Sequence, residues 1–222
     1  MIGRAIDEAA IYSERFPAAV HERRYAMWQE IAGYLQRYVP ADSVVLDIGA
    51  GEGYLVASLE ARERWAVDLR PPWEPLASRM RFVQASGLEP GDSLPTGTFD
   101  RALMSNYLEH LPTASDVIRQ FQVVHDLLRP GGQVIVLQPN IRYVGGAYWD
   151  FIDHKVPLTQ HSLEEAATLA GLRTVKTIVR FLPYTTKGRL PVDPRLVRLY
   201  LRVPLAWRLL GQQTLYIAER PR

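Results

Sequence analysis

The sequence predicts an α/β protein with a doubly wound, mostly parallel seven-stranded sheet and helices on both faces. Short apolar runs typical of buried strands alternate with segments of helical periodicity, which is the pattern of a parallel sheet. The first run, at 43–48, leads directly into a glycine-rich turn at 49–53. The chain has 222 residues, 47% of them hydrophobic, which is enough for a substantial core.

The expected elements follow in order along the chain. A helix is expected over 11–38, where Tyr25, Trp28, Ile31, Ala32 and Leu35 recur at helical spacing, and Pro40 ends it. Strands are expected at 43–48, 64–69, 81–85, 99–104, 133–137, 174–181 and 214–219, and helices at 53–59, 114–128 and 162–170. Residues 129–132 are expected to form a turn, and 194–210 a helix that Pro204 bends or ends.

The composition excludes several classes of protein. A formal net charge of +2 provides no general field for nucleic acid. The absence of cysteine excludes disulfides, thiolate metal sites and cysteine nucleophiles. No apolar run reaches the ~18–20 residues that span a bilayer, and the first residues lack the apolar core of a signal peptide. We therefore expect a cytoplasmic protein without a nucleic-acid partner.

The glycine-rich turn is the strongest indication of a ligand. Gly49, Gly51 and Gly53 follow a G-x-G-x-G spacing, whereas the dinucleotide fingerprint places its third glycine one residue later. The carboxylates of Asp47 and Glu52 would repel a pyrophosphate. A ligand with an ammonium group, an adenosine and no phosphate fits this turn better, and S-adenosylmethionine is such a ligand. A purely structural turn is the alternative.

Residues at the ends of the later strands complete a ligand site, because parallel strands present their carboxyl ends at one edge of the sheet. Asp68 ends the second strand, 15 positions after Gly53, and can accept hydrogen bonds from two ribose hydroxyls. Ala85 and Ser86 end the third strand, where an adenine would lie, and Ser105 and Asn106 end the fourth. A solvated or capping acid is the alternative for Asp68.

These residues resemble those of class I S-adenosylmethionine-dependent methyltransferases of the small-molecule branch, which have a Rossmann-like fold. Residues 45–53 resemble their motif I, 66–69 the ribose-binding strand end, 99–111 the fourth-strand motif, and 127–137 the L-x-P-G-G hairpin. The resemblance implies that the methionine moiety is held by Asp47, Gly49 and Gly51, the ribose by Asp68, and the adenine by Ala85 and Ser86, with Ser105 and Asn106 near the sulfonium. It also assigns Ala50, Gly53 and Leu69 to the cofactor site.

The sequence signals for the acceptor site are less specific than those for the cofactor site. The tetrapeptide Asn-Pro-Pro-Tyr of methyltransferases acting on bases is absent, since Ser105-Asn106-Tyr107-Leu108 stands in its place. No trio of metal carboxylates is evident, so no metal is expected. A hydroxyl acceptor usually needs a base, and His110 and His154 are the candidate catalytic residues. Alternatively, Glu109-His110 caps the connection between strand and helix, and His161 is expected at a helix entry.

The loop at 143–154 should lie over the sulfonium because it follows the fifth strand. It combines aromatic surfaces with acids, and such surfaces grip carbohydrates and aromatic substrates. The candidate substrate-binding residues are therefore Tyr107, Tyr148, Trp149, Asp150 and Asp153. A structural lid is the alternative.

Residues 138–154 together with 181–187 resemble methyltransferases of bacterial polysaccharide and glycolipid gene clusters. This resemblance suggests a sugar hydroxyl, carried on a lipid, as the acceptor. The 194–210 segment has an apolar stripe, a basic face of Arg195, Arg198 and Arg202, and no acid before Ala218, so it could lie at an anionic membrane surface. Its apolar stripe could equally pack on the domain.

We therefore expect one methyltransferase domain over 1–222, with an N-terminal helical cover at 1–40, a cofactor-binding core at 41–140, and the acceptor loop, late strands and basic helix at 141–222. The expected reaction transfers a methyl group to a small or glycan-linked hydroxyl. N-methylation of a small amine or amino sugar, a nucleotide-dependent oxidoreductase and a non-catalytic S-adenosylmethionine-binding module are the alternatives.

Overall fold

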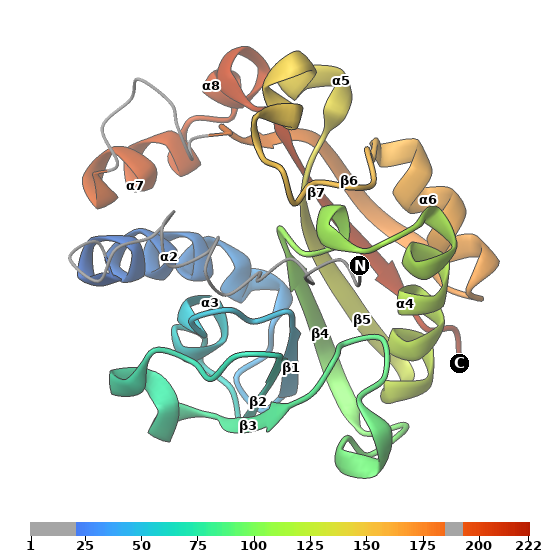
Figure 1. Ribbon diagram of the computed structural model, residues 1–222. Coiled ribbons are helices and arrows are strands. Elements are labelled where there is room, and N and C mark those ends of the chain that lie inside the picture. Colours follow the sequence, from blue (N-terminus) through green and yellow to red (C-terminus); the bar gives the residue numbers. More distant parts are fainter. Residues whose placement is uncertain (1–20, 185–192) are drawn as a thin grey trace, which may run out of the picture.

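A computed structural model describes residues 21–184 and 193–222 and contains a seven-stranded sheet (Figure 1). The strands are β1 (Val44–Ile48), β2 (Glu63–Asp68), β3 (Arg81–Gln84), β4 (Phe99–Ser105), β5 (Leu128–Pro139), β6 (Arg173–Leu182) and β7 (Gln213–Glu219). Their spatial order is β3-β2-β1-β4-β5-β7-β6. Only β7 is antiparallel to its two neighbours, while the other pairs are parallel. The predicted mostly parallel seven-stranded sheet is confirmed.

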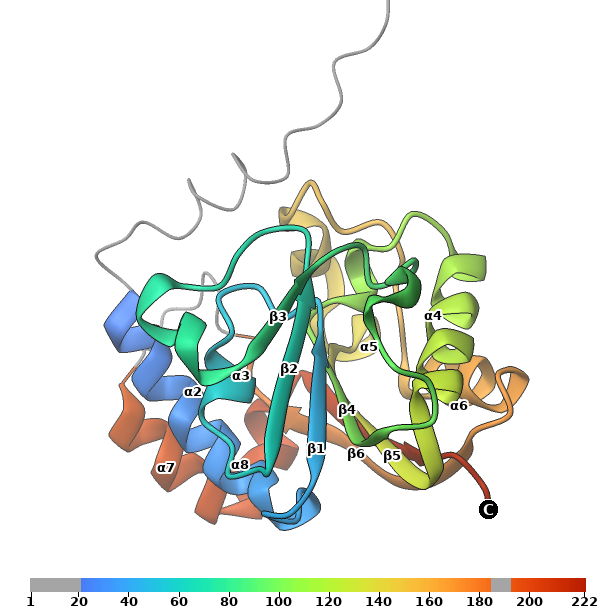
Figure 2. The same cartoon turned by 90° about the horizontal axis from the view of Figure 1, so that it is seen from below.

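Helices cover both faces of this sheet, as predicted (Figure 2). One face carries α2 (His21–Leu35), α3 (Tyr54–Ala57), α7 (Pro194–Arg202) and α8 (Pro204–Leu210), and the other carries α4 (Ala114–Leu127) and α6 (Gln160–Leu169). A short helix, α5 (Ile141–Val144), follows β5. The described 3-10 turns are η2 (Gln36–Tyr38), η3 (Glu74–Arg79), η4 (Gly91–Ser93), η5 (Leu108–His110) and η6 (Gly145–Asp150).

The sheet packs against one apolar cluster on each of its faces, and the alternation of side chains in β1 explains why. Val44, Leu46 and Ile48 belong to the apolar cluster shared with α4 and α6. Val45 belongs to the cluster shared with α2 and α3, because successive residues of a strand face opposite sides. Asp47 follows the alternation of Val45 and lies on the α3 side, where it is 1% exposed. A carboxyl group is therefore buried directly beneath the glycine-rich turn.

The turn expected at 129–132 lies within a strand, whereas the break expected at Pro204 is present. The turn predicted at 129–132 is part of β5, where a register shift between Phe99 and Arg101 absorbs the glycines. The helix predicted over 194–210 is divided into α7 and α8 at Val203 and Pro204, as the proline indicated. Two parts of the predictions lie outside the described residues. These are residues 11–20 of the predicted first helix and residues 185–187, which belong to the resemblance to polysaccharide and glycolipid methyltransferases.

Both α7 and α8 pack on the domain. Leu201 and Trp207 are buried, and the Trp207 ring lies 5.2 Å from that of Phe181 and 5.5 Å from that of Tyr34, centroid to centroid. Arg198 of α7 donates to both carboxylate oxygens of Glu30 of α2, at 2.8 and 2.5 Å. Of the apolar stripe predicted at Leu196, Leu199, Tyr200, Val203 and Trp207, Trp207 is buried, whereas Leu196, Leu199 and Val203 are exposed, as are Leu205, Leu209 and Leu210.

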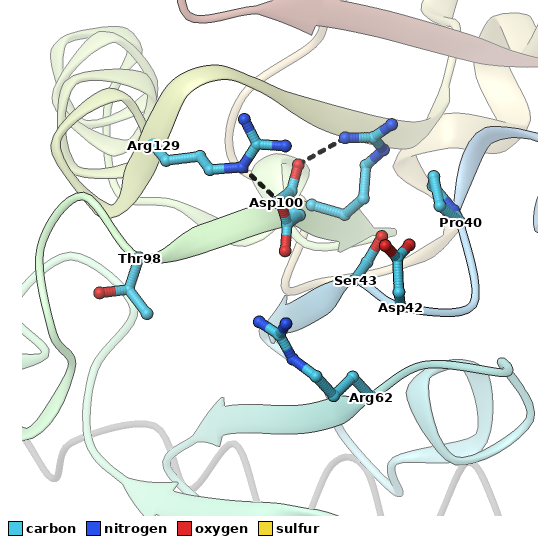
Figure 3. A pocket seen from close by; sticks show the side chains of 8 residues that line it. Pro40, Asp42, Ser43, Arg62, Thr98, Asp100 and Arg129 are labelled. Carbon is cyan, nitrogen blue, oxygen red and sulfur yellow. Dashed lines mark hydrogen bonds and ion pairs between the residues drawn. The ribbon is translucent and has the colours of Figure 1, made fainter.

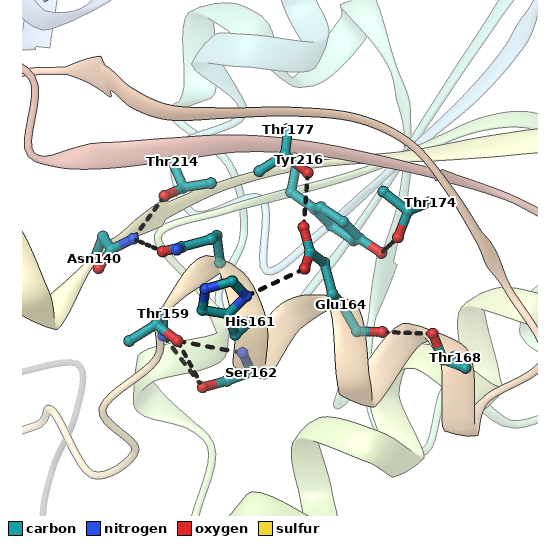
Figure 4. A network of polar contacts seen from close by, with 11 residues as sticks. Asn140, Thr159, His161, Ser162, Glu164, Thr168, Thr174, Thr177, Thr214 and Tyr216 are labelled. Atoms are coloured by element: carbon teal, nitrogen blue, oxygen red, sulfur yellow. Dashed lines mark hydrogen bonds and ion pairs between the residues drawn. The ribbon is translucent and has the colours of Figure 1, made fainter. Parts of the chain in front are cut away.

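A polar network fixes the start of α6 against the sheet (Figure 4). Thr159 and Ser162 form a capping box, and Asn140 donates to Gln160 at 2.8 Å and to Thr214 at 3.0 Å. His161 lies in the first helical turn and contacts Glu164 at 3.4 Å, which confirms its expected place at a helix entry. No helix among the described residues is long and apolar enough to cross a bilayer.

Candidate active site

A cavity of about 1240 Å³ opens at the carboxyl ends of the parallel strands. Its walls include the glycine-rich turn, the residues that follow β2, β3 and β4, residues 151 and 153–155, and one side of α2, α7 and α8. Ligand pockets commonly measure about 300–1,000 Å³. The cavity therefore has room for a cofactor and an acceptor together, at the edge of the sheet where such folds bind their ligands.

The glycine-rich turn can approach a ligand closely because side chains are excluded from it. Gly49, Gly51 and Gly53 have φ angles of 67°, 53° and 76°, which only glycine adopts readily. A Cβ atom on Gly49 would lie 2.2 Å from Cδ2 of Tyr107. The amide of Gly49 donates to the carbonyl of Val67 at 2.9 Å, so the turn is tied to the end of β2.

Asp68 lies on the cavity wall and also holds the turn. Its Oδ2 accepts from the amide of Gly51 at 2.8 Å, and its Oδ1 accepts from the amide of Arg70 at 3.0 Å. A carboxylate has about four lone-pair sites, so two acceptor positions remain for ribose hydroxyls. The geometry fits the role that the sequence predicts for this residue.

Asp47 lies under the turn and does not line the cavity. Its Oδ1 receives no hydrogen bond from the residues that the structure describes. Burial, and secondarily the charge of Asp68, raises the pKa of Asp47 to about 8, and the amide of Val56 opposes this shift. A cationic ligand group above the turn would favour the ionised form of this carboxyl.

The ends of β3 and β4 also reach the cavity. Its walls include Ala85 and Ser86 after β3 and Ser105 and Asn106 at the end of β4. Asn106 has a φ of 49° and is the one non-glycine residue with a positive φ among those described. Asparagine tolerates this conformation better than other side chains do, and such strain gathers at functional sites. The expected cofactor residues Ala50 and Leu69 are on the wall as well.

The two candidate catalytic histidines lie together. The rings of His110 and His154 are 5.1 Å apart, centroid to centroid, and both line the cavity. His110 Nδ1 lies 3.3 Å from Asp153 Oδ2 and 3.1 Å from the carbonyl oxygen of Asp153. Glu109 lines the same wall and is 1% exposed; burial raises its pKa, while the nearby charge of His110 opposes this effect.

Some predicted site residues lie away from the cavity wall. Gly53 caps α3 and packs against Met80, with 2.9 Å between its ideal Cβ position and Met80 Cε. Tyr148 is buried and donates to the carbonyl of Val156, while Trp149 and Asp150 are exposed outside the cavity. Tyr107 and Asp153 are on the wall. The predicted acceptor loop therefore contributes only residues near its end, Phe151, Asp153 and His154.

A large part of the wall was not predicted from the sequence. It comprises residues of α2, the end of β6 and the two residues after it, the two late helices with the residue between them, and the first residue of β7: Arg24, Met27, Trp28, Ile31, Leu182, Pro183, Tyr184, Leu196, Val197, Leu199, Tyr200, Val203, Ala206, Leu210 and Gln213. Gly87, Leu88 and Glu109 were also missed. The helical periodicity of Trp28 and Ile31 was the available signal, and it indicated core packing.

A second, polar pocket of about 320 Å³ lies at the opposite, amino-terminal edge of the strands (Figure 3). Asp100 pairs with Arg129 there at 2.5 Å and accepts from the amide of Val44 at 2.8 Å. Because Asp100 satisfies the nearby cation and amide, the pocket is a structural junction between β1, β4 and β5.

Comparison with known proteins decides the family. Residues 19–177 match the family model described as a methyltransferase domain. The chain belongs to this methyltransferase family. No sequence among the curated proteins matches it. The family match argues against the oxidoreductase alternative and confirms the predicted resemblance to class I S-adenosylmethionine-dependent methyltransferases, together with the fold, the enzyme class and the cofactor, S-adenosylmethionine.

Solved structures share the fold of this methyltransferase. A methyltransferase of Archaeoglobus fulgidus is 21% identical, with 96% of this chain and 100% of that chain covered and a TM-score of 0.62. The 1,6-didemethyltoxoflavin-N1-methyltransferase of Burkholderia thailandensis, with bound 1,6-didemethyltoxoflavin and S-adenosylhomocysteine, is 23% identical over 96% of this chain and 89% of that chain, with a TM-score of 0.59. A Haloferax volcanii methyltransferase, in complex with the activator Trm112, is 14% identical over 96% of this chain and 97% of that chain, with a TM-score of 0.66.

Proposed function

We propose that this methyltransferase methylates a hydroxyl group of a sugar carried on a lipid, in the synthesis of a cell-envelope polysaccharide or glycolipid. The observation that carries the proposal is the position of His110 and His154. Both stand on the wall of the cavity that also contains Asn106 and Tyr107 at the end of β4. An alcohol needs a group that removes its proton, and histidine does this near neutral pH.

S-adenosylmethionine supplies an electrophilic methyl group on a positively charged sulfur. The acceptor oxygen forms a bond to the methyl carbon as the carbon–sulfur bond breaks, and the electron pair of that bond remains on sulfur. The hydroxyl proton passes to His110 or His154. Asp153 lies beside Nδ1 of His110 and favours a proton on that nitrogen. The other ring nitrogen, Nε2, is then the one that can take the hydroxyl proton. The cavity positions the two reactants, which accounts for a large share of such rate enhancements.

The apolar wall of the cavity supports a lipid on the acceptor. Leu196, Leu199 and Leu210 line the cavity although each is about half exposed or more, so they present apolar surface to an incoming molecule. Trp28 and Ile31 of α2 line the same cavity. Burying apolar surface stabilises binding by roughly 25 cal/mol per Å². A hydrocarbon chain bound along this wall would leave a polar head group near the histidines.

Methyl transfer from labelled cofactor tests the proposal. We expect transfer to lipid-linked sugar fractions and not to free monosaccharides or small amines, with the methyl group on oxygen by mass spectrometry. Leu199→Ser should raise the KM for the lipid-linked acceptor and leave the Kd of the cofactor unchanged. Leu169→Ser is the matched control, since Leu169 is 59% exposed on α6, Leu199 is 60% exposed, and only Leu199 lines the cavity. A methylated nitrogen in the product would overturn the proposal.

The same helices support contact with an anionic membrane surface. Leu205 and Leu209 of α8 are exposed and do not line the cavity, and Arg195 and Arg208 make no ion pair with a described residue. Exposed leucines beside arginines are typical of helices that lie on anionic lipid. Flotation with vesicles should show binding that requires anionic lipid and weakens with salt. Equal, negligible flotation with neutral and anionic vesicles would contradict this contact.

A further inference from the structure

Glu109, His110 and His154 form a compact group on the acceptor side of the cavity. One possible ligand atom from each lies within 4.8 Å of those of the other two. Small side-chain rotations bring atoms at this spacing into the first coordination sphere of one ion. Residues 109 and 110 come from η5, and residue 154 follows a different strand, so the fold itself assembles the group.

Glu109 brings a buried carboxyl group to this cluster. It is 1% exposed, and its Oε2 receives no hydrogen bond from a described residue. Leaving a buried carboxylate oxygen unsatisfied costs free energy, which a bound cation would offset. The backbone carbonyl of Glu109 accepts from the amides of Lys155 at 2.8 Å and Val156 at 3.2 Å. These bonds fix the segment that carries His154 beside Glu109.

The two histidines are oriented by their neighbours. Asp153 contacts Nδ1 of His110, which leaves the lone pair of Nε2 for coordination. A carboxylate behind a ligating histidine is a common arrangement in metal sites. The His154 ring stacks on Phe151 with centroids 5.1 Å apart and lies 4.7 Å from the ring of Tyr148. These contacts restrict both rings, so only small rotations separate the three side chains from a common ion.

We propose that Glu109, His110 and His154 bind a divalent transition-metal ion of the class of Zn²⁺, Co²⁺ or Mn²⁺. Two imidazoles and one carboxylate suit these ions, whereas Mg²⁺ and Ca²⁺ prefer oxygen ligands alone. The proposal departs from the sequence expectation of no metal, which considered only a trio of carboxylates.

Three protein ligands leave coordination positions open for an acceptor oxygen. The role of the ion in catalysis rests on the proposed function, whereas the binding of the ion does not. A hydroxyl on the ion loses its proton to water more readily, and its oxygen then attacks the methyl carbon. With the ion bound, the two histidines would hold the metal and water would take the hydroxyl proton, so they would serve as the base only in the metal-free enzyme.

Titration of the chelator-treated full chain with Zn²⁺ and Co²⁺ tests the site, by calorimetry and by the visible absorption of Co²⁺. We expect one ion per chain. Glu109→Gln, His110→Gln and His154→Gln should each weaken binding at least ~10-fold. The exposed His161 of α6 provides the matched control, and His161→Gln should bind the ion as the wild type does. Retained binding of S-adenosylhomocysteine shows that a variant is folded. No binding by the wild type at about 1 mM ion, or equal binding by all variants, would overturn the proposal.

Activity separates this proposal from the function proposed above. Full methylation of a sugar hydroxyl by metal-free protein would overturn the catalytic role of the ion and leave the proposed function standing. Ion binding that depends on the three residues, together with an acceptor that proves to be an amine, would overturn the proposed function and support the site.

Discussion

The buried carboxyl of Asp47 makes a sharp prediction about stability. Burial raises its pKa to about 8 in the folded protein, whereas an unfolded aspartate titrates near ~3.9. Between these values the folded state binds a proton that the unfolded state has lost, so this group makes the free energy of unfolding fall as pH rises. The slope is ~1.4 kcal/mol per pH unit, and it flattens near the folded pKa.

Asp47→Asn removes the titration and leaves a side chain of similar shape. Relative to the wild type, the variant should gain about 2 kcal/mol of stability between pH 6 and pH 8, because over this range the folded wild type retains a proton that its unfolded state has released. Urea denaturation at several pH values measures the difference, and the other titrating groups cancel in the comparison. Asp92→Asn, at an exposed position in η4, serves as the control and should show no such gain. Parallel pH profiles for wild type and Asp47→Asn would refute the reasoning.

Two further predictions concern the cofactor site. Asp68→Ala should weaken S-adenosylmethionine binding by about 1–3 kcal/mol in calorimetry, because ribose hydroxyls lose a charged acceptor; unchanged affinity would show that Asp68 does not bind the ribose. Gly49→Ala should abolish cofactor binding and destabilise the fold in thermal denaturation, since its Cβ would lie 2.2 Å from Tyr107 at a φ of +67°. Gly97→Ala is the control, because Gly97 has a φ of +61° and open space around it. This variant should lose only the conformational cost of ~1–2 kcal/mol from its free energy of unfolding. A Gly49→Ala protein with wild-type affinity would mean that the turn does not approach the cofactor.

Most residues that the sequence singled out for the cofactor line one cavity, and the signals that pointed to them are local. The spacing of Gly49, Gly51 and Gly53 after an apolar strand is a matter of neighbouring residues, and parallel pairing brings Asp68 to the same edge. The aromatic loop was harder to interpret, because Tyr148 and Trp149 carry the same kind of side chain and yet one is buried and the other exposed. Nothing in their spacing decides which ring turns inward.

The wall formed by α2, α7 and α8 depends on contacts between distant segments. The ion pair between Glu30 and Arg198 joins residues that are 168 positions apart, and no local pattern predicts it. Glu109 was interpreted only as part of a possible cap, because its burial depends on the return of the segment at 154–156. The sequence alone therefore did not predict the cavity walls that α2 and α7 form.

The two late helices occupy the connection between β6 and β7, which are adjacent antiparallel strands. Both ends of the connection leave from one edge of the sheet, on the far side of β5 from the glycine-rich turn. Acceptor preference can therefore diverge among relatives through this one insertion while the methyl-donor machinery stays unchanged. An exchanged insertion would have to keep counterparts of Leu201 and Trp207, since these buried side chains anchor it to the underlying core. The connection is thus a natural point for redesigning the enzyme toward other acceptors.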